Sequence, residues 1–121
     1  MNTLKIQKAV VDRLITLSVD HENARVGQSP GFDVQEFINY INEPALREQG
    51  QVLKSLDVEA FRDLLAIFWL GRGDYADFCT AFEHAKGFSA DEARKYLRGR
   101  RLNENLSAGL VALEGQRILV D

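Results

Sequence analysis

The chain of 121 residues contains only one cysteine, two prolines, two histidines and one tryptophan. The single cysteine, Cys79, excludes an internal disulfide, and chains without disulfides are typical of a reducing compartment. The two prolines, Pro30 and Pro44, leave long segments free to form helices. We therefore expect a cytoplasmic protein that is held together by its hydrophobic core.

Long hydrophobic runs and a strong charge of one sign are also missing. The apolar stretch from Leu64 to Gly71 is far shorter than the roughly 20 residues that cross a bilayer. Lys5 and Lys8 interrupt any apolar segment that could serve as a signal peptide. A formal net charge of -3 gives no overall attraction for nucleic acid or anionic lipid. We expect no membrane association.

The sequence is rich in apolar residues at helical spacing. Hydrophobic residues make up 45% of the chain and charged residues 27%, which is ordinary for a globular domain. The length suits one core and is short for two domains. Because helical periodicity recurs and sustained alternation does not, we predict an all-α fold. This fold is a compact five- or six-helix bundle, formed as a single domain by residues 1–121.

The first part of the sequence predicts two helices separated by a loop. Residues 3–24 carry an apolar face wide enough to lie deep in the core or to meet a second subunit. Residues 25–32 form a loop by composition. Asp33 is a good cap for the second helix, which should end before Pro44. The sequence leaves the structure of residues 44–56 open.

Helix-start signals mark the second half of the chain. Asp57 should cap a central helix that is apolar nearly all round. Gly71 is expected to close that helix in the left-handed conformation, and Asp74 to cap the next one. Ser89 and Glu92 have the spacing of a capping box for a further helix.

The last elements carry three further expectations. Cys79 should be buried on the helix that follows Asp74. Asn103 should cap the final helix, in which Gly109 indicates close packing against another helix. The tail, residues 114–121, contains apolar residues that either dock on the body or fray.

Three motifs follow one another in the second half of the chain. They are Trp-Leu-Gly-Arg-Gly-Asp at 69–74, Tyr-Leu-Arg-Gly at 96–99 and Asn-Leu-Ser-Ala-Gly-Leu at 105–110. With the apolar helix before them, residues 56–113 resemble a small bacterial family known as domain of unknown function 3775. This chain departs from the family pattern at Arg100 and Arg101, where members tend to carry a small residue and a proline. The resemblance implies a helical domain and brings no established activity.

The first of these motifs supplies the candidate binding residues Trp69, Arg72 and Asp74. Arg72 can lock the helix corner by binding the last carbonyls or Asp74. Alternatively, Arg72 and the free N–H groups near Asp74 form a clamp for an anion, or contact a partner. Trp69 is either a core aromatic or an anchor in an interface.

Nothing in the sequence predicts a catalytic residue, a cofactor or a metal site. Cys79 and His84 stand five residues apart, which places them about 140° apart on a helix, so they cannot act as a nucleophile and its base there. His21 and His84 each lack the three or four ligands of a zinc site.

A basic stretch after a glycine turn offers an alternative function, the binding of nucleic acid. Its residues are Arg94, Lys95, Arg98, Arg100 and Arg101. Asp91 and Glu92 argue against this function, because they would face phosphates at the start of a recognition helix.

We therefore expect a non-catalytic bacterial protein-interaction or regulatory module that binds an unknown protein partner. A homodimer through the first helix is a further hypothesis. Nucleic-acid binding is the alternative, and an enzyme with a pocket near Arg72 is the third reading.

Overall fold

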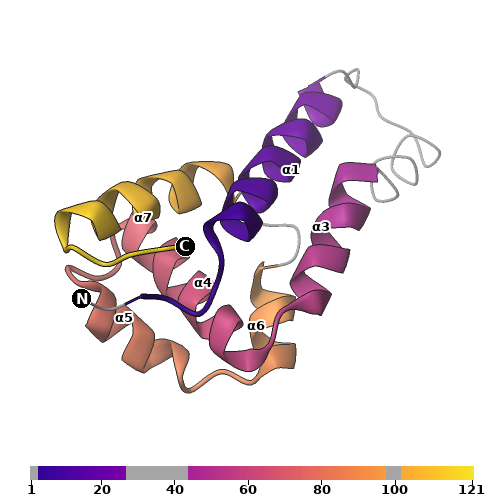
Figure 1. Ribbon diagram of the computed structural model, residues 1–121. Coiled ribbons are helices and arrows are strands. Elements are labelled where there is room, and N and C mark those ends of the chain that lie inside the picture. Colours follow the sequence, from indigo (N-terminus) through magenta and orange to yellow (C-terminus); the bar gives the residue numbers. More distant parts are fainter. Residues whose placement is uncertain (1–2, 27–43, 98–101) are drawn as a thin grey trace.

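The computed structural model describes residues 3–26, 44–97 and 102–121 (Figure 1). In these ranges the chain forms six helices: α1 (Lys8–Val26), α3 (Pro44–Ser55), α4 (Val58–Arg72), α5 (Phe78–Ala85), α6 (Ala90–Leu97) and α7 (Asn103–Gly115). The predicted all-α bundle is confirmed. Arg25 and Val26 continue α1, while the rest of the expected loop and the helix expected at 33–43 lie outside the described residues.

The central helix of the bundle is α4, as the sequence predicts. Asp57 caps it, because the Asp57 carboxylate accepts the N–H of Ala60 at 2.8 Å. Every residue of α4 from Leu64 to Leu70 is buried, and α5, α6 and α7 all pack around it (Figure 1). The remaining helix pair is α1 and α3, which pack side by side, and α1 also contacts α7.

Two glycines let α4 and α7 cross at very short distance. A Cβ on Gly109 would lie 2.2 Å from the carbonyl oxygen of Ile67, so the predicted close packing is confirmed. A Cβ on Gly71 would lie 1.7 Å from the carbonyl oxygen of Asn105. The expectation that Gly71 closes α4 is wrong: Gly71 lies inside the helix, and Gly73, with φ of 88°, takes the left-handed conformation.

The segment before α1 is extended and pairs with the tail. The predicted helix start at residue 3 is wrong, because α1 begins at Lys8. Thr3 and Leu119 form a parallel bridge, and the N–H of Leu4 donates to the Leu119 carbonyl at 2.9 Å. The N–H of Lys8 donates to the Asp121 carbonyl at 3.0 Å. Residues 119–121 therefore dock on the body instead of fraying.

The start of α7 is capped by a residue from α1. The expectation that Asn103 caps this helix is wrong, since Asn103 is its first helical residue and Leu102 occupies the cap position without a side-chain hydrogen bond. Instead, the buried Ser18 hydroxyl accepts the N–H groups of Leu102 and Asn103 at 3.0 and 3.2 Å. This contact joins two helices that are far apart in the sequence.

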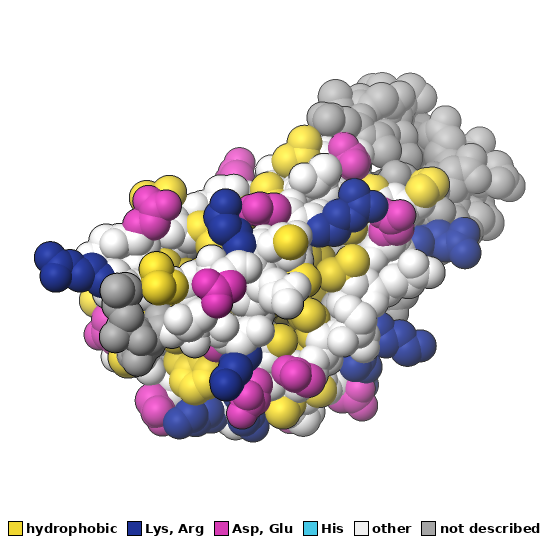
Figure 2. Space-filling model, in the orientation of Figure 1, with side chains coloured by type: hydrophobic (Ala, Val, Ile, Leu, Met, Phe, Trp, Pro, Cys, Tyr) yellow, Lys and Arg dark blue, Asp and Glu magenta, His cyan; other side chains and the backbone are white. Residues whose placement is uncertain are grey.

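The other helix starts follow local signals. Ser89 and Glu92 form the predicted capping box. The N–H of Glu92 donates to the Ser89 hydroxyl at 3.1 Å, and the N–H of Ser89 donates to the Glu92 carboxylate at 3.2 Å. Most of the segment 44–56, which the sequence left open, forms α3 (Pro44–Ser55), and this helix buries Ala45, Gln49 and Leu53. In the described ranges, none of the helices combines the length and hydropathy needed to cross a membrane. Figure 2 shows Lys and Arg intermixed with Asp and Glu over the visible face.

Candidate functional site

The Trp-Leu-Gly-Arg-Gly-Asp motif forms a closed corner at the end of α4. The N–H of Gly73 donates to the Leu70 carbonyl at 3.2 Å, and the N–H of Asp74 donates to the Trp69 carbonyl at 3.0 Å. This pair of bonds is the Schellman arrangement, which needs a left-handed residue at the position of Gly73. The second glycine of the motif therefore ends the helix, and the first lets α7 approach.

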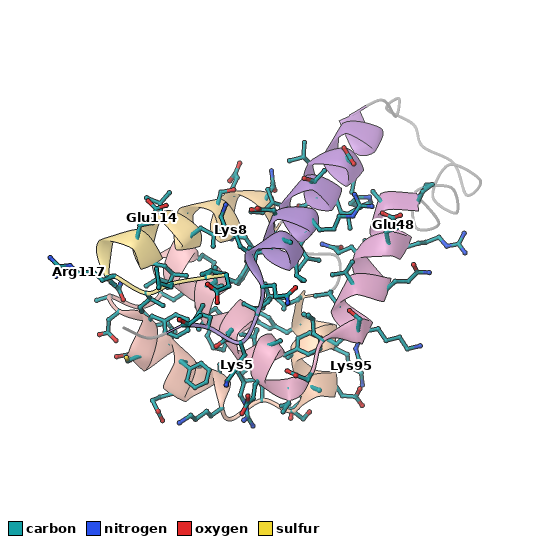
Figure 3. The ribbon with its side chains drawn as sticks, viewed as in Figure 1. Lys5, Lys8, Glu48, Lys95, Glu114 and Arg117 are labelled. Atoms are coloured by element: carbon teal, nitrogen blue, oxygen red, sulfur yellow. The ribbon has the colours of Figure 1, made fainter. Side chains whose placement is uncertain are left out.

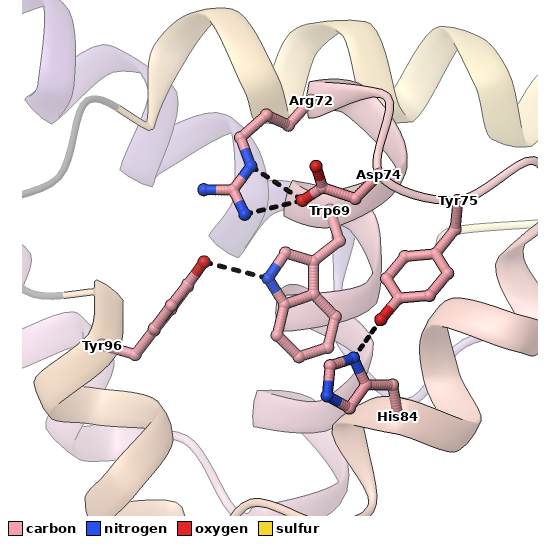
Figure 4. Close-up of polar contacts among 6 residues, drawn as sticks. All are labelled: Trp69, Arg72, Asp74, Tyr75, His84 and Tyr96. Atoms are coloured by element: carbon pink, nitrogen blue, oxygen red, sulfur yellow. Dashed lines mark hydrogen bonds and ion pairs between the residues drawn. The ribbon is translucent and has the colours of Figure 1, made fainter.

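Arg72 and Asp74 bind each other across this corner (Figure 4). The Nε and Nη2 atoms of Arg72 lie 2.8 and 2.6 Å from the same carboxylate oxygen of Asp74. The hydrogen bond to Asp74 raises the pKa of the Arg72 guanidinium above its ordinary value. The Arg72 guanidinium also stands over the Phe68 ring, 5.3 Å from its centroid. The structure thus favours the reading in which Arg72 locks the corner.

The prediction that Asp74 caps the next helix is wrong. The cap of α5 is Asp77, whose carboxylate accepts the N–H of Thr80 at 2.8 Å. These bonds to Thr80 lower the pKa of Asp77 below its ordinary value. Both aspartates precede α5. Asp77 takes the cap because it stands directly before Phe78, the first residue of the helix, whereas Asp74 lies further back and pairs with Arg72.

Trp69 is the centre of an aromatic cluster and is only 3% exposed. Its indole N–H donates to the Tyr96 hydroxyl at 3.1 Å, and its ring stacks on His84 with centroids 4.7 Å apart (Figure 4). Tyr75 and Phe88 complete the cluster with centroids 5.9 and 5.4 Å from Trp69. Trp69 therefore joins α4 to α5 and α6 and is placed as a core aromatic.

His84 and Cys79 do not form a reactive pair. His84 is hydrogen-bonded to the Tyr75 hydroxyl through Nδ1. The prediction that Cys79 is buried is wrong: its side chain is exposed, because α5 turns Phe78 and Ala81 toward the core instead. Across the described parts of the chain, no three His, Cys, Asp or Glu side chains are grouped closely enough to hold a metal ion.

A cleft of about 380 Å³ lies beside Cys79, at the N-terminal segment. One wall holds Asp63, whose carboxylate is buried and accepts the backbone N–H groups of Lys5 and Ile6 at 2.6 and 3.1 Å. Burial raises the pKa of Asp63 by more than these two hydrogen bonds lower it. Sequence reasoning missed this residue, because its partners lie more than fifty positions earlier in the chain.

A second cleft, of about 420 Å³, lies between α3 and α6, and we call it the basic cleft. Its lining residues are Arg47, Gly50, Gln51, Leu53 and Lys54 of α3, and Arg94 of α6. Three of these six described residues are cationic and none of the six is acidic. Neither this cleft nor the one beside Cys79 includes Arg72.

Of the two members of the predicted basic stretch that the structure describes, Arg94 lines this cleft. Its Nη1 atom lies 3.0 Å from the carboxylate of Asp91, and its guanidinium stands over the Phe61 ring, 5.8 Å from the centroid. Lys95 is exposed on α6 (Figure 3). Arg98, Arg100 and Arg101 lie outside the described residues.

Arg47 and Lys54 are the functional candidates that sequence reasoning missed. They are seven residues apart, which puts them on one face of α3 two turns from each other. This spacing could have indicated from the sequence that the two cations share a helix face. What the sequence did not show is that α6 brings Arg94 to the same cleft.

Comparison with known proteins places the chain in a family. No curated protein and no solved structure matches it. A family model described as protein of unknown function (DUF3775) matches residues 46–114, more than half of the chain. The matched region runs from α3 into α7, so it contains both the Arg72 corner and the residues of the basic cleft. The chain therefore belongs to the family described as protein of unknown function (DUF3775).

Proposed function

We propose that this chain is a non-catalytic interaction module of the bacterial cytoplasm, and that it binds an acidic segment of a partner protein in the basic cleft. The observation that carries the proposal is the convergence of Arg47, Lys54 and Arg94 on one cleft in a chain whose net charge is -3. Positive charge that is concentrated against an overall negative background selects a local, negatively charged partner.

Nearby acidic residues do not neutralise this charge. In the described parts of the chain, Arg47 and Lys54 take part in no ion pair. Glu48, the neighbour of Arg47, points toward α1 (Figure 3) and pairs with Arg13. Asp91 contacts the Arg94 guanidinium through its Nη1 atom. Two cations of the cleft are therefore free for an incoming carboxylate.

The Arg72 corner is a poorer candidate for recognition. An anion would have to displace Asp74, which already holds two nitrogens of Arg72. Trp69 is buried and hydrogen-bonded to Tyr96, so it cannot anchor a partner without local unfolding. We assign this corner a structural role within the module.

Nucleic acid is the second candidate, favoured by Arg94 and the basic residues that follow it. The described geometry suits it less well. The exposed Asp91 and Glu92 lie in the first turn of α6 and would repel a phosphate backbone. Among the described residues, no aromatic side chain lines the basic cleft, so that part of the chain offers unpaired bases no stacking surface there.

The first helix supports a monomer better than a homodimer. The apolar face that suggested a dimer packs inside the chain, where Val11, Leu14 and Leu17 are buried. We expect light scattering to give the mass of one chain, 13.7 kDa, across a wide concentration range. A mass that doubles as the concentration rises would support the homodimer hypothesis instead.

Binding of a fluorescent peptide rich in glutamate tests the proposal directly. We expect the wild type to bind it, and the double variant Arg47→Gln, Lys54→Gln to lose at least tenfold in affinity. The matched control is Lys8→Gln, Lys86→Gln, which removes the same charge at exposed positions away from the cleft. Equal losses in both double variants would show that net charge alone attracts the peptide and would reject the cleft. Tighter, salt-sensitive binding of a nucleic-acid oligomer would favour the alternative.

A further inference from the structure

We infer that the basic cleft is built for a phosphate monoester, carried on a phosphorylated side chain of the partner segment. This inference rests on the proposed function and names the group that is recognised. Four features support it: the charge of the cleft, its donors, a glycine in its wall and its floor.

Charge matching favours phosphate over a carboxylate. The cleft holds three cations, and Asp91 offsets one of them through its contact with Arg94. About two positive charges remain. A phosphate monoester carries about -1.5 to -2 at pH 7, whereas a carboxylate carries -1 and would leave one cation unpaired.

The donors of the cleft suit an anion with several oxygens. Two guanidinium groups and one ammonium group approach from two different helices, and guanidinium groups bind phosphate oxygens in pairs. The Arg94 side chain is partly exposed, and its ion pair with Asp91 uses the Nη1 atom. Its Nη2 group is left to donate to an anion in the cleft.

Gly50 gives the cleft its room. It lies in the middle of α3, where glycine weakens a helix relative to alanine. The reasons that explain Gly71, Gly73 and Gly109 do not apply to it: its φ is not positive, and a Cβ would meet nothing within 4 Å. A side chain at this position would project into the cleft. The glycine is therefore explained by the space that it leaves for a ligand.

The size and floor of the cleft fit a group larger than free phosphate. A volume of about 420 Å³ lies in the range of small-ligand pockets and leaves space for residues that flank a phosphorylated side chain. The floor includes Leu53, which is fully buried and apolar. An apolar floor lowers the local dielectric constant and so strengthens the ionic contacts above it.

The test compares three fluorescent peptides of one neutral sequence that carry serine, glutamate or phosphoserine at the central position. We expect the phosphoserine peptide to bind the wild type at least tenfold more tightly than the glutamate peptide, and the serine peptide not to bind. The variant Gly50→Gln should reduce phosphopeptide affinity at least tenfold, although all three cations remain. The matched control is Gly115→Gln, another helical glycine at which a Cβ meets nothing within 4 Å.

The outcomes separate this inference from the proposed function. Equal binding of the glutamate and phosphoserine peptides would overturn the phosphate inference and leave the acidic-segment proposal standing. Binding of neither peptide would overturn both. If free phosphoserine bound as tightly as the phosphopeptide, the ligand would be a small phosphate ester and the partner segment would be rejected. Unchanged phosphopeptide affinity in Gly50→Gln would place the site elsewhere on the surface.

Discussion

Replacing Gly71 or Gly109 with alanine should destabilise this fold, although the same change stabilises most helices. The Cβ atom would meet a backbone carbonyl oxygen at 1.7 or 2.2 Å, far inside van der Waals contact. A backbone oxygen in a packed helix cannot rotate away, so α4 and α7 would have to separate. Such overpacking costs about 1–3 kcal/mol or more, and the helix propensity of alanine returns up to about 1 kcal/mol. We expect a net loss of about 1–2 kcal/mol or more at each position.

Urea denaturation followed by far-ultraviolet circular dichroism measures this loss as a lower midpoint at constant slope. Gly115→Ala and Gly50→Ala are the controls, because neither position has an atom within 4 Å of the new Cβ. Both controls should gain up to about 1 kcal/mol of stability. If Gly71→Ala and Gly109→Ala unfolded at or above the wild-type midpoint, the close crossing of α4 and α7 would be refuted.

Three further predictions concern contacts within the fold. Ser18→Ala should cost about 1–2 kcal/mol, because it removes the only side-chain cap on the described start of α7; Ser107→Ala, an exposed change on α7, should cost far less in the same urea titration. Burial raises the pKa of Asp63 above its ordinary 3.8, so the folded state binds this proton more tightly than the unfolded state. The contribution of Asp63 to stability should therefore fall as pH rises above about 3.8, and Asp63→Asn should show a flatter pH dependence between pH 4 and 7, whereas identical profiles would contradict this. Arg72→Gln should lower stability by less than about 1 kcal/mol, since its ion pair is partly exposed, and should leave peptide binding at the basic cleft unchanged.

Features that depend on neighbouring residues were predictable from the sequence. The Asp57 cap and the Ser89–Glu92 capping box were predicted correctly, because each is completed within one helical turn. The apolar pattern of α4 also identified the centre of the bundle, since a helix that is apolar nearly all round has to be enclosed by others.

Features that depend on packing were not predictable in this way. Two glycines and two aspartates stand near the end of α4, and the sequence assigned helix closure to Gly71 and the cap to Asp74. The structure gives these roles to Gly73 and Asp77, because Gly71 is needed for the approach of α7 and Asp74 for the pair with Arg72. Local propensity alone could not rank residues of the same type a few positions apart.

The candidate site shows the same division between local and distant signals. The motif that stood out in the sequence, residues 69–74, forms a corner whose polar groups bind one another. The basic cleft is assembled from ordinary surface residues of two helices, and only the placement of α6 beside α3 brings Arg94 to Arg47 and Lys54. A site of this kind leaves no compact motif in the sequence.

The extended segment before α1 also bears on how the protein is made. Three of its N–H groups and that of Lys8, the first residue of α1, are held by residues that emerge later from the ribosome: Lys5 and Ile6 by Asp63, and Leu4 and Lys8 by the carbonyls of Leu119 and Asp121. During synthesis Lys5 and Ile6 must wait for Asp63, and Leu4 and Lys8 must wait for residues 119 and 121. The helices that lie between can form earlier, so we expect the pairing with residues 119–121 to close after them.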